Sequence, residues 1–152
     1  MKMSLLKTFL AAFVLIVTAF PVLAQDEGER DVEYLGTNEN FPFSEAVRVG
    51  KTLYLSGQIG IDREVGGLVE GGIGPETRQT LDNISTTLEK YGSGMDDVVK
   101  CLVMLADIEE WPAMNEVYKT YFPVNKPARS AFAGSGLALN SRVEIECIAI
   151  LD

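Results

Sequence analysis

Residues 143–149, Val-Glu-Ile-Glu-Cys-Ile-Ala, alternate between apolar and acidic side chains through their first four positions. A strand points successive side chains to opposite faces of its sheet, so Glu144 and Glu146 share one face while the apolar residues share the other. Two neighbouring carboxylates leave water only when they are paired, hydrogen-bonded or used in chemistry. The pattern therefore predicts a sheet with one covered face. It leaves open whether Glu144 is a solvated residue of a half-exposed strand or part of a site.

The rest of the chain predicts the element order β-β-α-β-α-β-β. The expected strands are 44–49, 52–56, 98–106, 128–134 and 142–151, and the expected helices are 75–91 and 110–122. Strand 98–106 is largely apolar, which predicts a central strand buried on both faces. Gly57 either ends the second strand or introduces a bulge. Helices segregated to one face of a mixed sheet give an α+β two-layer domain, whose other sheet face needs cover.

The N-terminal residues have the pattern of an export signal. Lys2 and Lys7 form a basic start, residues 9–17 are apolar, and Val-Leu-Ala before Gln25 is a cleavage site of small residues. A membrane anchor is the competing interpretation, but the apolar run is short for a span of about 20 residues and an acidic segment follows it. We expect residues 1–24 to be removed and the mature protein to be periplasmic or secreted, without stable membrane insertion.

The mature chain divides into two parts. Residues 25–40 are polar and acidic and form either a linker or an edge strand at 32–35, and residues 41–152 form the domain. With Lys2 and Lys7 removed, 11 basic residues stand against 22 acidic ones, a net charge of −11. Such a surface disfavours nucleic acid and anionic membranes as partners, so neither is expected.

The chain contains no histidine and only two cysteines. The lack of histidine excludes Ser-His-Asp and Cys-His catalytic arrangements and every histidine metal site, so no metal is expected. Cys101 and Cys147 each fall in an expected strand. An exported protein permits a disulfide, which needs Cα atoms within about 7 Å, but both positions also suit small buried thiols. We expect two free, buried cysteines.

Four short motifs follow one another along the chain: Leu-Ser-Gly-Gln-Ile at 55–59, Met-Asn-Glu-Val-Tyr at 114–118, Pro-Ala-Arg-Ser at 127–130 and Glu-Ile-Glu at 144–146. Each is weak alone, but in this order they resemble the RidA/YjgF family of reactive-intermediate (enamine/imine) deaminases over about residues 41–151. The resemblance implies a chorismate-mutase-like fold that assembles as a homotrimer around a central barrel, with active sites at the subunit clefts.

The resemblance also implies roles for individual residues. Arg129 matches the arginine that clamps the substrate carboxylate, and Glu144 matches the position that holds or activates the attacking water. Ser56 and Gly57 match the pocket wall, and Asn115 lies in a helix that approaches the site. Each has a plainer alternative: a surface arginine, a solvated glutamate, an ordinary strand end and a solvated helix residue.

Two positions depart from the family pattern. Phe43 stands where many members carry tyrosine, so the wall loses a hydroxyl donor. Ala131 stands where cysteine is frequent, although it is largely the backbone carbonyl of that residue that matters in the family. Both departures affect substrate preference and rate more than fold or carboxylate binding.

The expected function is hydrolysis of reactive 2-imino or enamine acids to 2-oxo acids and ammonia. An imine carbon is already electrophilic, so this chemistry needs no metal or organic cofactor. The alternative is a non-catalytic trimer that binds small carboxylates, or a stress-protective interaction protein, which the loss of the phenol at Phe43 mildly favours. A nuclease role fits poorly with a net charge of −11.

Overall fold

The computed structural model of the protein describes residues 31–152. The expected export signal at residues 1–24 lies outside this range, as do residues 25–30. No helix within the described part is long and apolar enough to cross a membrane.

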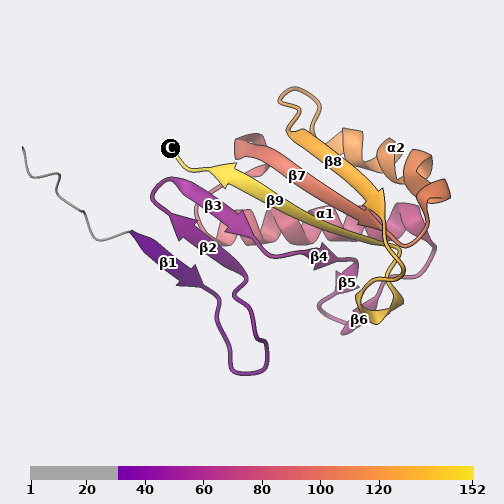
Figure 1. The fold of residues 1–152 in the computed structure, drawn as a ribbon, viewed down its shortest axis with the longest axis horizontal. Helices are drawn as coiled ribbons and strands as arrows, with labels where there is room; N and C mark the ends of the chain where they lie inside the picture. The colour runs from indigo at the N-terminus through magenta and orange to yellow at the C-terminus, as the bar shows by residue number, and fades with distance from the viewer. Residues whose placement is uncertain (1–30) are drawn as a thin grey trace, which may run out of the picture.

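A mixed sheet covered by two helices forms the domain (Figure 1). The strands of the main sheet are β1 (Val32–Leu35), β2 (Ala46–Val49), β3 (Thr52–Leu55), β4 (Gln58–Ile59), β7 (Val98–Leu105), β8 (Ala128–Ala133) and β9 (Val143–Ile150). Their order is β1-β2-β3-β9-β7-β8, with β4 also pairing with β9. Only β7 and β8 pair in parallel. The predicted α+β class is confirmed.

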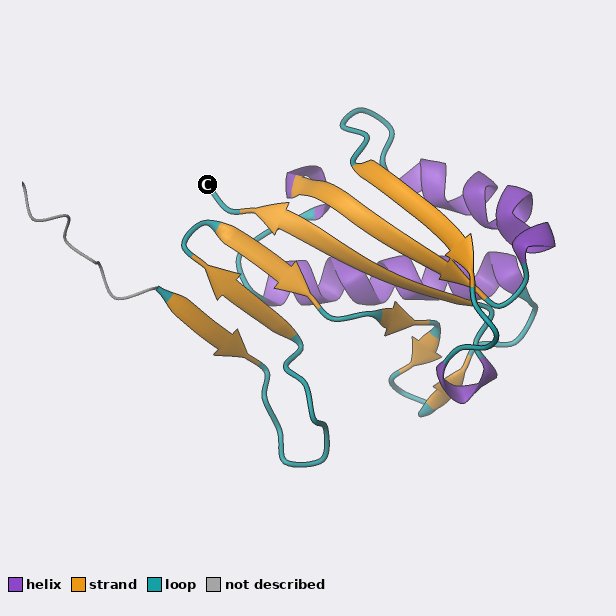
Figure 2. Ribbon diagram, viewed as in Figure 1, coloured by secondary structure: helices purple, strands orange, loops and turns teal. Residues whose placement is uncertain are grey.

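The helices are α1 (Ile73–Lys90) and α2 (Trp111–Tyr121), and Figure 2 shows both on the same side of the sheet. Three short 3₁₀ turns, η1 (Met95–Asp97), η2 (Ile108–Glu110) and η3 (Ala138–Asn140), and a small sheet of β5 (Ile61–Asp62) and β6 (Gly67–Leu68) complete the fold. Helix α1 begins two residues before the predicted Pro75, which still lies in the first turn, where a missing N–H costs little.

The core lies between α1 and the covered face of the sheet. Leu81, Ile84 and Leu88 recur at helical spacing and are fully buried against β7 and β9. Threonines on the same helix are also buried, and the hydroxyls of Thr77 and Thr80 donate to the carbonyl four residues earlier at 2.7 and 2.8 Å. These local bonds satisfy hydroxyls that would otherwise be buried without a partner.

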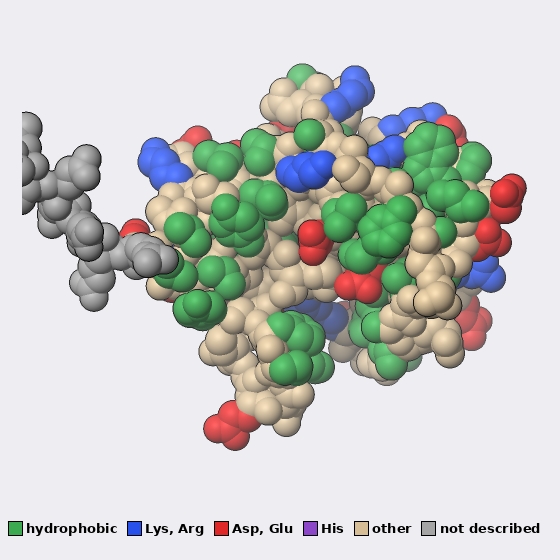
Figure 3. Space-filling view, in the orientation of Figure 1, with side chains coloured by type: hydrophobic (Ala, Val, Ile, Leu, Met, Phe, Trp, Pro, Cys, Tyr) green, Lys and Arg blue, Asp and Glu red, His purple; other side chains and the backbone are tan. Residues whose placement is uncertain are grey.

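The other face of the sheet carries no layer within the described chain. Strand β9 alternates as predicted, with Glu144 and Glu146 on this open face and Cys147 on the covered face. The prediction that β7 is buried on both faces is wrong, because Leu102 and Met104 project onto the open face and stay partly exposed. Figure 3 views this face and shows hydrophobic side chains gathered over the strands, with acidic groups among them.

Two features of the sheet concern alternatives that the sequence left open: a linker or an edge strand at residues 32–35, and a strand end or a bulge at Gly57. Residues 32–35 form the edge strand β1, which pairs antiparallel with β2. The pairing with β9 shifts by one residue between Tyr54↔Ile148 on β3 and Gln58↔Ile145 on β4, so the chain bulges at Gly57. Bulges of this kind re-aim the strand beside them.

The two cysteines form a disulfide, so the expectation of free thiols is wrong. Cys101 on β7 and Cys147 on β9 are directly opposite each other in the antiparallel register, with Cα atoms 4.1 Å apart. Both are buried on the covered face, as expected. The strand pairing, which brings residues 46 positions apart into contact, makes the bond geometrically available.

Candidate functional site

Arg129 lies on the edge strand β8, on the face covered by α2. Its neighbour in the parallel register is Cys101, which points to the covered face. The guanidinium carbon is 4.5 Å from the ring centroid of Tyr118 and 5.7 Å from that of Trp111. None of the ion pairs within residues 31–152 includes Arg129. A half-exposed guanidinium with no carboxylate partner is available to bind an anion.

The two aromatic rings hold this arginine in place. Trp111 and Tyr118 are seven residues apart on α2, two helical turns, so they lie on one face of the helix. Tyr118 is only 6% exposed and its hydroxyl has no hydrogen-bond partner within the described residues. Burial raises the pKa of Tyr118 to about 12, against the opposing effect of Arg129. Sequence reasoning assigned both rings to a helical stripe and missed their contact with Arg129.

Arg129 opens into a cleft of about 420 Å³, which we call the arginine cleft. It is lined by Ile108, Glu109, Trp111, Pro112, Arg129 and Ala131. Ala131 follows Arg129 by two residues on β8 and therefore shares its face. Asn115 is half-buried on α2 and lines neither this cleft nor the one around Glu144.

Glu144 lies in a second cleft of about 680 Å³, the glutamate cleft. Its walls include Phe41, Phe43, Gly57, Ile59, Leu139 and Glu144 itself. Burial raises the pKa of the Glu144 carboxyl, and the neighbouring charge of Glu146 raises it further. A carboxylate of raised pKa binds a proton more strongly, which suits a general base.

The bulge at Gly57 lets the backbone approach Glu144. A Cβ atom at Gly57 would overlap the Glu144 Oε1 oxygen, so a larger residue here would displace the Glu144 carboxylate. The Ser56 hydroxyl donates to the Ser44 carbonyl at 2.7 Å, which ties β3 to the segment that carries Phe43. Ser56 thus supports the wall of the glutamate cleft from behind.

Glu45 anchors the same wall through one of its carboxylate oxygens, Oε2. It accepts hydrogen bonds from Lys90 Nζ and from the Tyr91 hydroxyl, both at 2.7 Å. The hydrogen bond from Lys90 lowers the pKa of Glu45. Gly36 passes so close that a Cβ atom there would lie 2.5 Å from the Tyr91 hydroxyl.

One chain does not bring Arg129 and Glu144 into the same cleft. Arg129 is paired with Cys101, which points to the covered face. Glu144 is paired with Met104, which points to the open face, as does Phe132, the residue paired with Met104 on β8. The structure brings Glu144 together with Gly57 and Phe43, and Arg129 together with Ala131. Arg129 and Glu144 therefore lie in separate clefts on opposite faces of one sheet.

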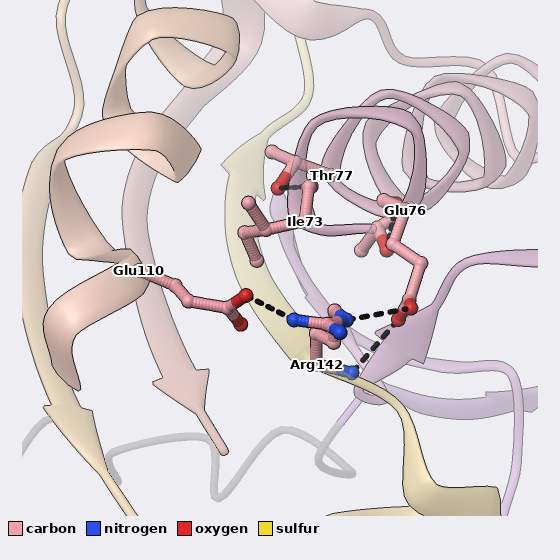
Figure 4. A network of polar contacts seen from close by, with 6 residues as sticks. Ile73, Glu76, Thr77, Glu110 and Arg142 are labelled. Atoms are coloured by element: carbon pink, nitrogen blue, oxygen red, sulfur yellow. Dashed lines mark hydrogen bonds and ion pairs between the residues drawn. The ribbon is translucent and has the colours of Figure 1, made fainter. Parts of the chain in front are cut away.

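A network of charges centred on Arg142 joins the start of β9 to α1 and to the residue before α2 (Figure 4). Its backbone N–H donates to the buried carboxylate of Glu76 at 2.8 Å, and its guanidinium pairs with Glu110. Glu110 directly precedes Trp111 of the arginine cleft, and Arg142 precedes Glu144 by two residues. The network fixes the start of β9 against both helices. Within residues 31–152, no group of three acidic or cysteine side chains is placed to hold a metal ion.

Comparison with known proteins identifies the group to which this geometry belongs. Residues 37–151 match the family described as endoribonuclease L-PSP. The chain belongs to the RidA/YjgF/L-PSP family. The resemblance drawn from four short motifs is thereby confirmed over most of the domain.

Individual members of the family share much of this sequence and fold. The human protein named 2-iminobutanoate/2-iminopropanoate deaminase is 47% identical over 109 residues, which cover 72% of this chain and 80% of the human protein. A putative endoribonuclease from Thermotoga maritima is 39% identical, with a TM-score of 0.74 over 79% of this chain and 98% of its own. RidA from the Antarctic bacterium Psychrobacter is 37% identical, with a TM-score of 0.70 over 73% and 89%.

Proposed function

We propose that this protein is a deaminase that hydrolyses 2-imino acids, and their enamine tautomers, to 2-oxo acids and ammonia. The observation that carries this conclusion is the 47% identity to human 2-iminobutanoate/2-iminopropanoate deaminase over 72% of the chain. The site supplies matching chemistry: an unpaired arginine for a carboxylate, and a glutamate of raised pKa beside an open wall.

Arg129 binds the substrate carboxylate through two parallel N–H···O bonds, which its planar guanidinium provides. Glu144 accepts a proton from water as the water oxygen bonds to the imine carbon. The resulting tetrahedral carbon keeps this oxygen as its carbonyl and releases the nitrogen as ammonia. One water is consumed and no electrons are transferred. The raised pKa of Glu144 strengthens it as a proton acceptor and lets it return the proton to the leaving nitrogen.

We further propose that the active protein is a homotrimer in which Arg129 of one protomer completes the glutamate cleft of the next. The placement of the two residues on opposite faces of one sheet supports this assembly. The open sheet face supports it as well, because it exposes apolar side chains that a neighbouring sheet would cover. Those more than one-third exposed are Val32, Tyr34, Val49, Tyr54, Phe132 and Ile150.

Export to the periplasm or beyond is part of the same proposal. The signal-like residues 1–24 motivate it, and the Cys101–Cys147 disulfide supports it because such bonds persist in oxidising compartments. Intact mass of the protein recovered from the exported fraction tests it, with a chain starting at Gln25 as the expected result. A retained N-terminus would contradict it.

The direct test of the activity is ammonia release from freshly generated 2-iminopropionate and 2-iminobutyrate by the mature protein. We expect release well above the spontaneous rate.

The second candidate function is non-catalytic binding of small carboxylates, which Phe43 favours because its ring has no hydroxyl to donate to a substrate. Calorimetric binding of 2-oxobutyrate without any acceleration of ammonia release would favour that candidate.

A further inference from the structure

The wall of the glutamate cleft exposes three large apolar side chains. Phe41 and Phe43 are each 56% exposed, and their ring centroids are 5.3 Å apart. Leu139 is far from these rings in the sequence, in η3, but it lines the same cleft and is 68% exposed. Exposed apolar groups gathered around one cleft mark a surface that gains free energy when an apolar partner covers it.

The backbone presents Leu139 in a conformation that side chains rarely adopt. Leu139 and Asn140 both lie in the left-handed region, with φ values of 54° and 60°. Non-glycine residues in this region are strained, and such strain is concentrated at ligand-binding and active sites. The strained turn therefore points to a role for Leu139 in the cleft beyond closing a loop.

Several polar residues around the cleft already have protein partners. The Asn83 side chain donates to the carbonyls of Ile59 and Ile61 at 3.0 and 2.9 Å. Glu45 is held by Lys90 and Tyr91, as described above. These groups support the wall and do not call for a polar ligand. Asn38, Gln58 and Arg63 also line the cleft, but most of its surface is apolar.

The cleft is also larger than a three- or four-carbon acid needs. Its volume of about 680 Å³ falls in the range of about 300–1,000 Å³ typical of pockets that enclose drug-sized ligands. Within a single protomer, a substrate whose side chain is a methyl or ethyl group is too small to cover the two phenylalanine rings and Leu139.

We propose that the preferred substrates of this deaminase are 2-imino acids with a large apolar side chain, aromatic or branched aliphatic, which packs against Phe41, Phe43 and Leu139 while Glu144 faces the imine carbon. This inference rests on the proposed deaminase function and names the substrate class of the same site. Phe43 is then a specificity-determining residue.

The test compares imino acids that differ only in side chain. An amino-acid oxidase in excess generates them in place from phenylalanine, leucine, alanine and 2-aminobutyrate, and 2-oxo acid formation above the uncatalysed rate is measured. One methylene in an apolar pocket changes kcat/KM by about 10–200-fold. We therefore expect kcat/KM for the phenylalanine- and leucine-derived substrates to exceed that for the alanine-derived substrate by at least about tenfold.

Variants at Phe43 test whether the wall of the glutamate cleft causes the preference for large substrates. Phe43→Ala should lower kcat/KM for the large substrates by about tenfold or more while changing the alanine-derived value much less. Phe43→Tyr keeps the ring and should keep the preference. Val65→Ala is the control: Val65 is 82% exposed in the turn between β5 and β6 and lines neither the arginine cleft nor the glutamate cleft. It should leave all rates unchanged.

The outcomes separate this inference from the function on which it rests. Faster turnover of the alanine-derived substrate, with a ratio that Phe43→Ala does not alter, would overturn the inference and leave the deaminase standing. If no imino acid is turned over, the proposed function fails, and calorimetry with 4-methyl-2-oxopentanoate and pyruvate then tests the apolar wall alone. Equal affinity for these two acids would overturn the inference there as well.

Discussion

At the scale of single residues, the two clefts place opposite charges in surroundings that suit the role proposed for each. Arg129 has no carboxylate partner among residues 31–152 and rests on two aromatic rings. Glu144 is partly removed from water beside a second carboxylate, which favours its protonated form. A guanidinium lacking a counter-ion attracts a carboxylate, and a glutamate that holds protons firmly can take one from water.

Replacing Arg129 should abolish carboxylate binding and turnover together. Arg129→Ala removes a charge-assisted contact worth about 1.5–3 kcal/mol, so the Kd for 2-oxobutyrate should rise by at least about tenfold. Arg129→Lys should recover little of this, because an ammonium group cannot form the paired bonds. Calorimetry and ammonia-release kinetics measure both quantities. Full activity in Arg129→Ala would remove Arg129 from the site.

Glu144→Gln should separate binding from catalysis. The variant keeps the shape of the side chain and should bind 2-oxobutyrate normally, while kcat falls by about 10²–10⁴-fold for loss of an acid–base group. Turnover equal to that of the parent protein would exclude Glu144 as the base.

The same residue fixes the direction of the pH dependence. The base works when ionised, and its pKa is raised, so kcat should fall as the pH drops through a value above the ordinary glutamate range. The stability effect follows from the same shift: the folded state favours protonated Glu144, so its ionisation lowers the free energy of unfolding as the pH rises. A pH–rate profile with its acid limb at ordinary glutamate pKa values would contradict the assignment.

Two substitutions at Tyr118 should distinguish its ring from its hydroxyl. Tyr118→Phe keeps the ring and removes a buried hydroxyl that has no partner in the described part of the chain, so stability and ligand binding should be unchanged or better. Tyr118→Leu removes the ring beneath Arg129 and should weaken 2-oxobutyrate binding by about 0.5–2 kcal/mol. KM should rise with little change in kcat, because the ring positions a binding group. Equal KM values for the two variants would show that the ring has no such role.

At the scale of elements, the pairing of β7 with β9 decides much of what sequence reasoning could and could not predict. The alternation at 143–150 correctly assigned the two faces of β9, and the apolar spacing in α1 correctly predicted its buried stripe. The disulfide was missed because it depends on the register between two strands 46 residues apart, which neither strand encodes alone. The two-residue strands β5 and β6 were missed because they are too short to show a period.

The candidate site was predicted unevenly for related reasons. Family motifs indicated Arg129 and Glu144, but only strand register shows that they lie on opposite faces. Tyr118 and Trp111 fit a core stripe equally well, and nothing in their spacing identifies the arginine above them. Leu139 carries no motif, and its place in the glutamate cleft depends on a strained turn.

Removing the disulfide should destabilise the fold. The bond closes a loop of 46 residues, which the chain-entropy model converts to about 4 kcal/mol. We expect the Cys101→Ala/Cys147→Ala double variant, or reduction of the parent protein, to lower the free energy of urea unfolding by about 2–4 kcal/mol. Reductant should have no effect on the double variant. An unchanged free energy of unfolding in the parent protein after verified reduction would contradict this expectation.

At the scale of the whole molecule, the described chain has two separate clefts and one sheet face that it leaves uncovered. In the proposed trimer, neighbouring protomers cover these open faces, and the edge strand β8 brings Arg129 of one chain to the glutamate cleft of the next. Activity then belongs to the assembly, and dilution below its dissociation constant should abolish turnover without unfolding the chain.

Mixing two inactive variants provides the sharpest test of the assembly. Arg129→Ala retains an intact Glu144, and Glu144→Gln retains an intact Arg129. Co-refolded trimers should therefore contain clefts with both native residues and recover up to about a quarter of the parent activity under random mixing. Each variant refolded alone is the control and should stay inactive. No recovery in mixed trimers, confirmed as mixed by mass spectrometry, would place both residues in a cleft of one chain.

Trp111 is the only tryptophan in the chain, and it lies in the arginine cleft beside Arg129, the residue proposed to bind the carboxylate. The tryptophan emission of the protein therefore originates in this cleft. A ligand that excludes water from this cleft should shift that emission to shorter wavelengths, and so should a neighbouring protomer that covers it. The molecule carries an intrinsic optical probe that reports occupancy and assembly without a label.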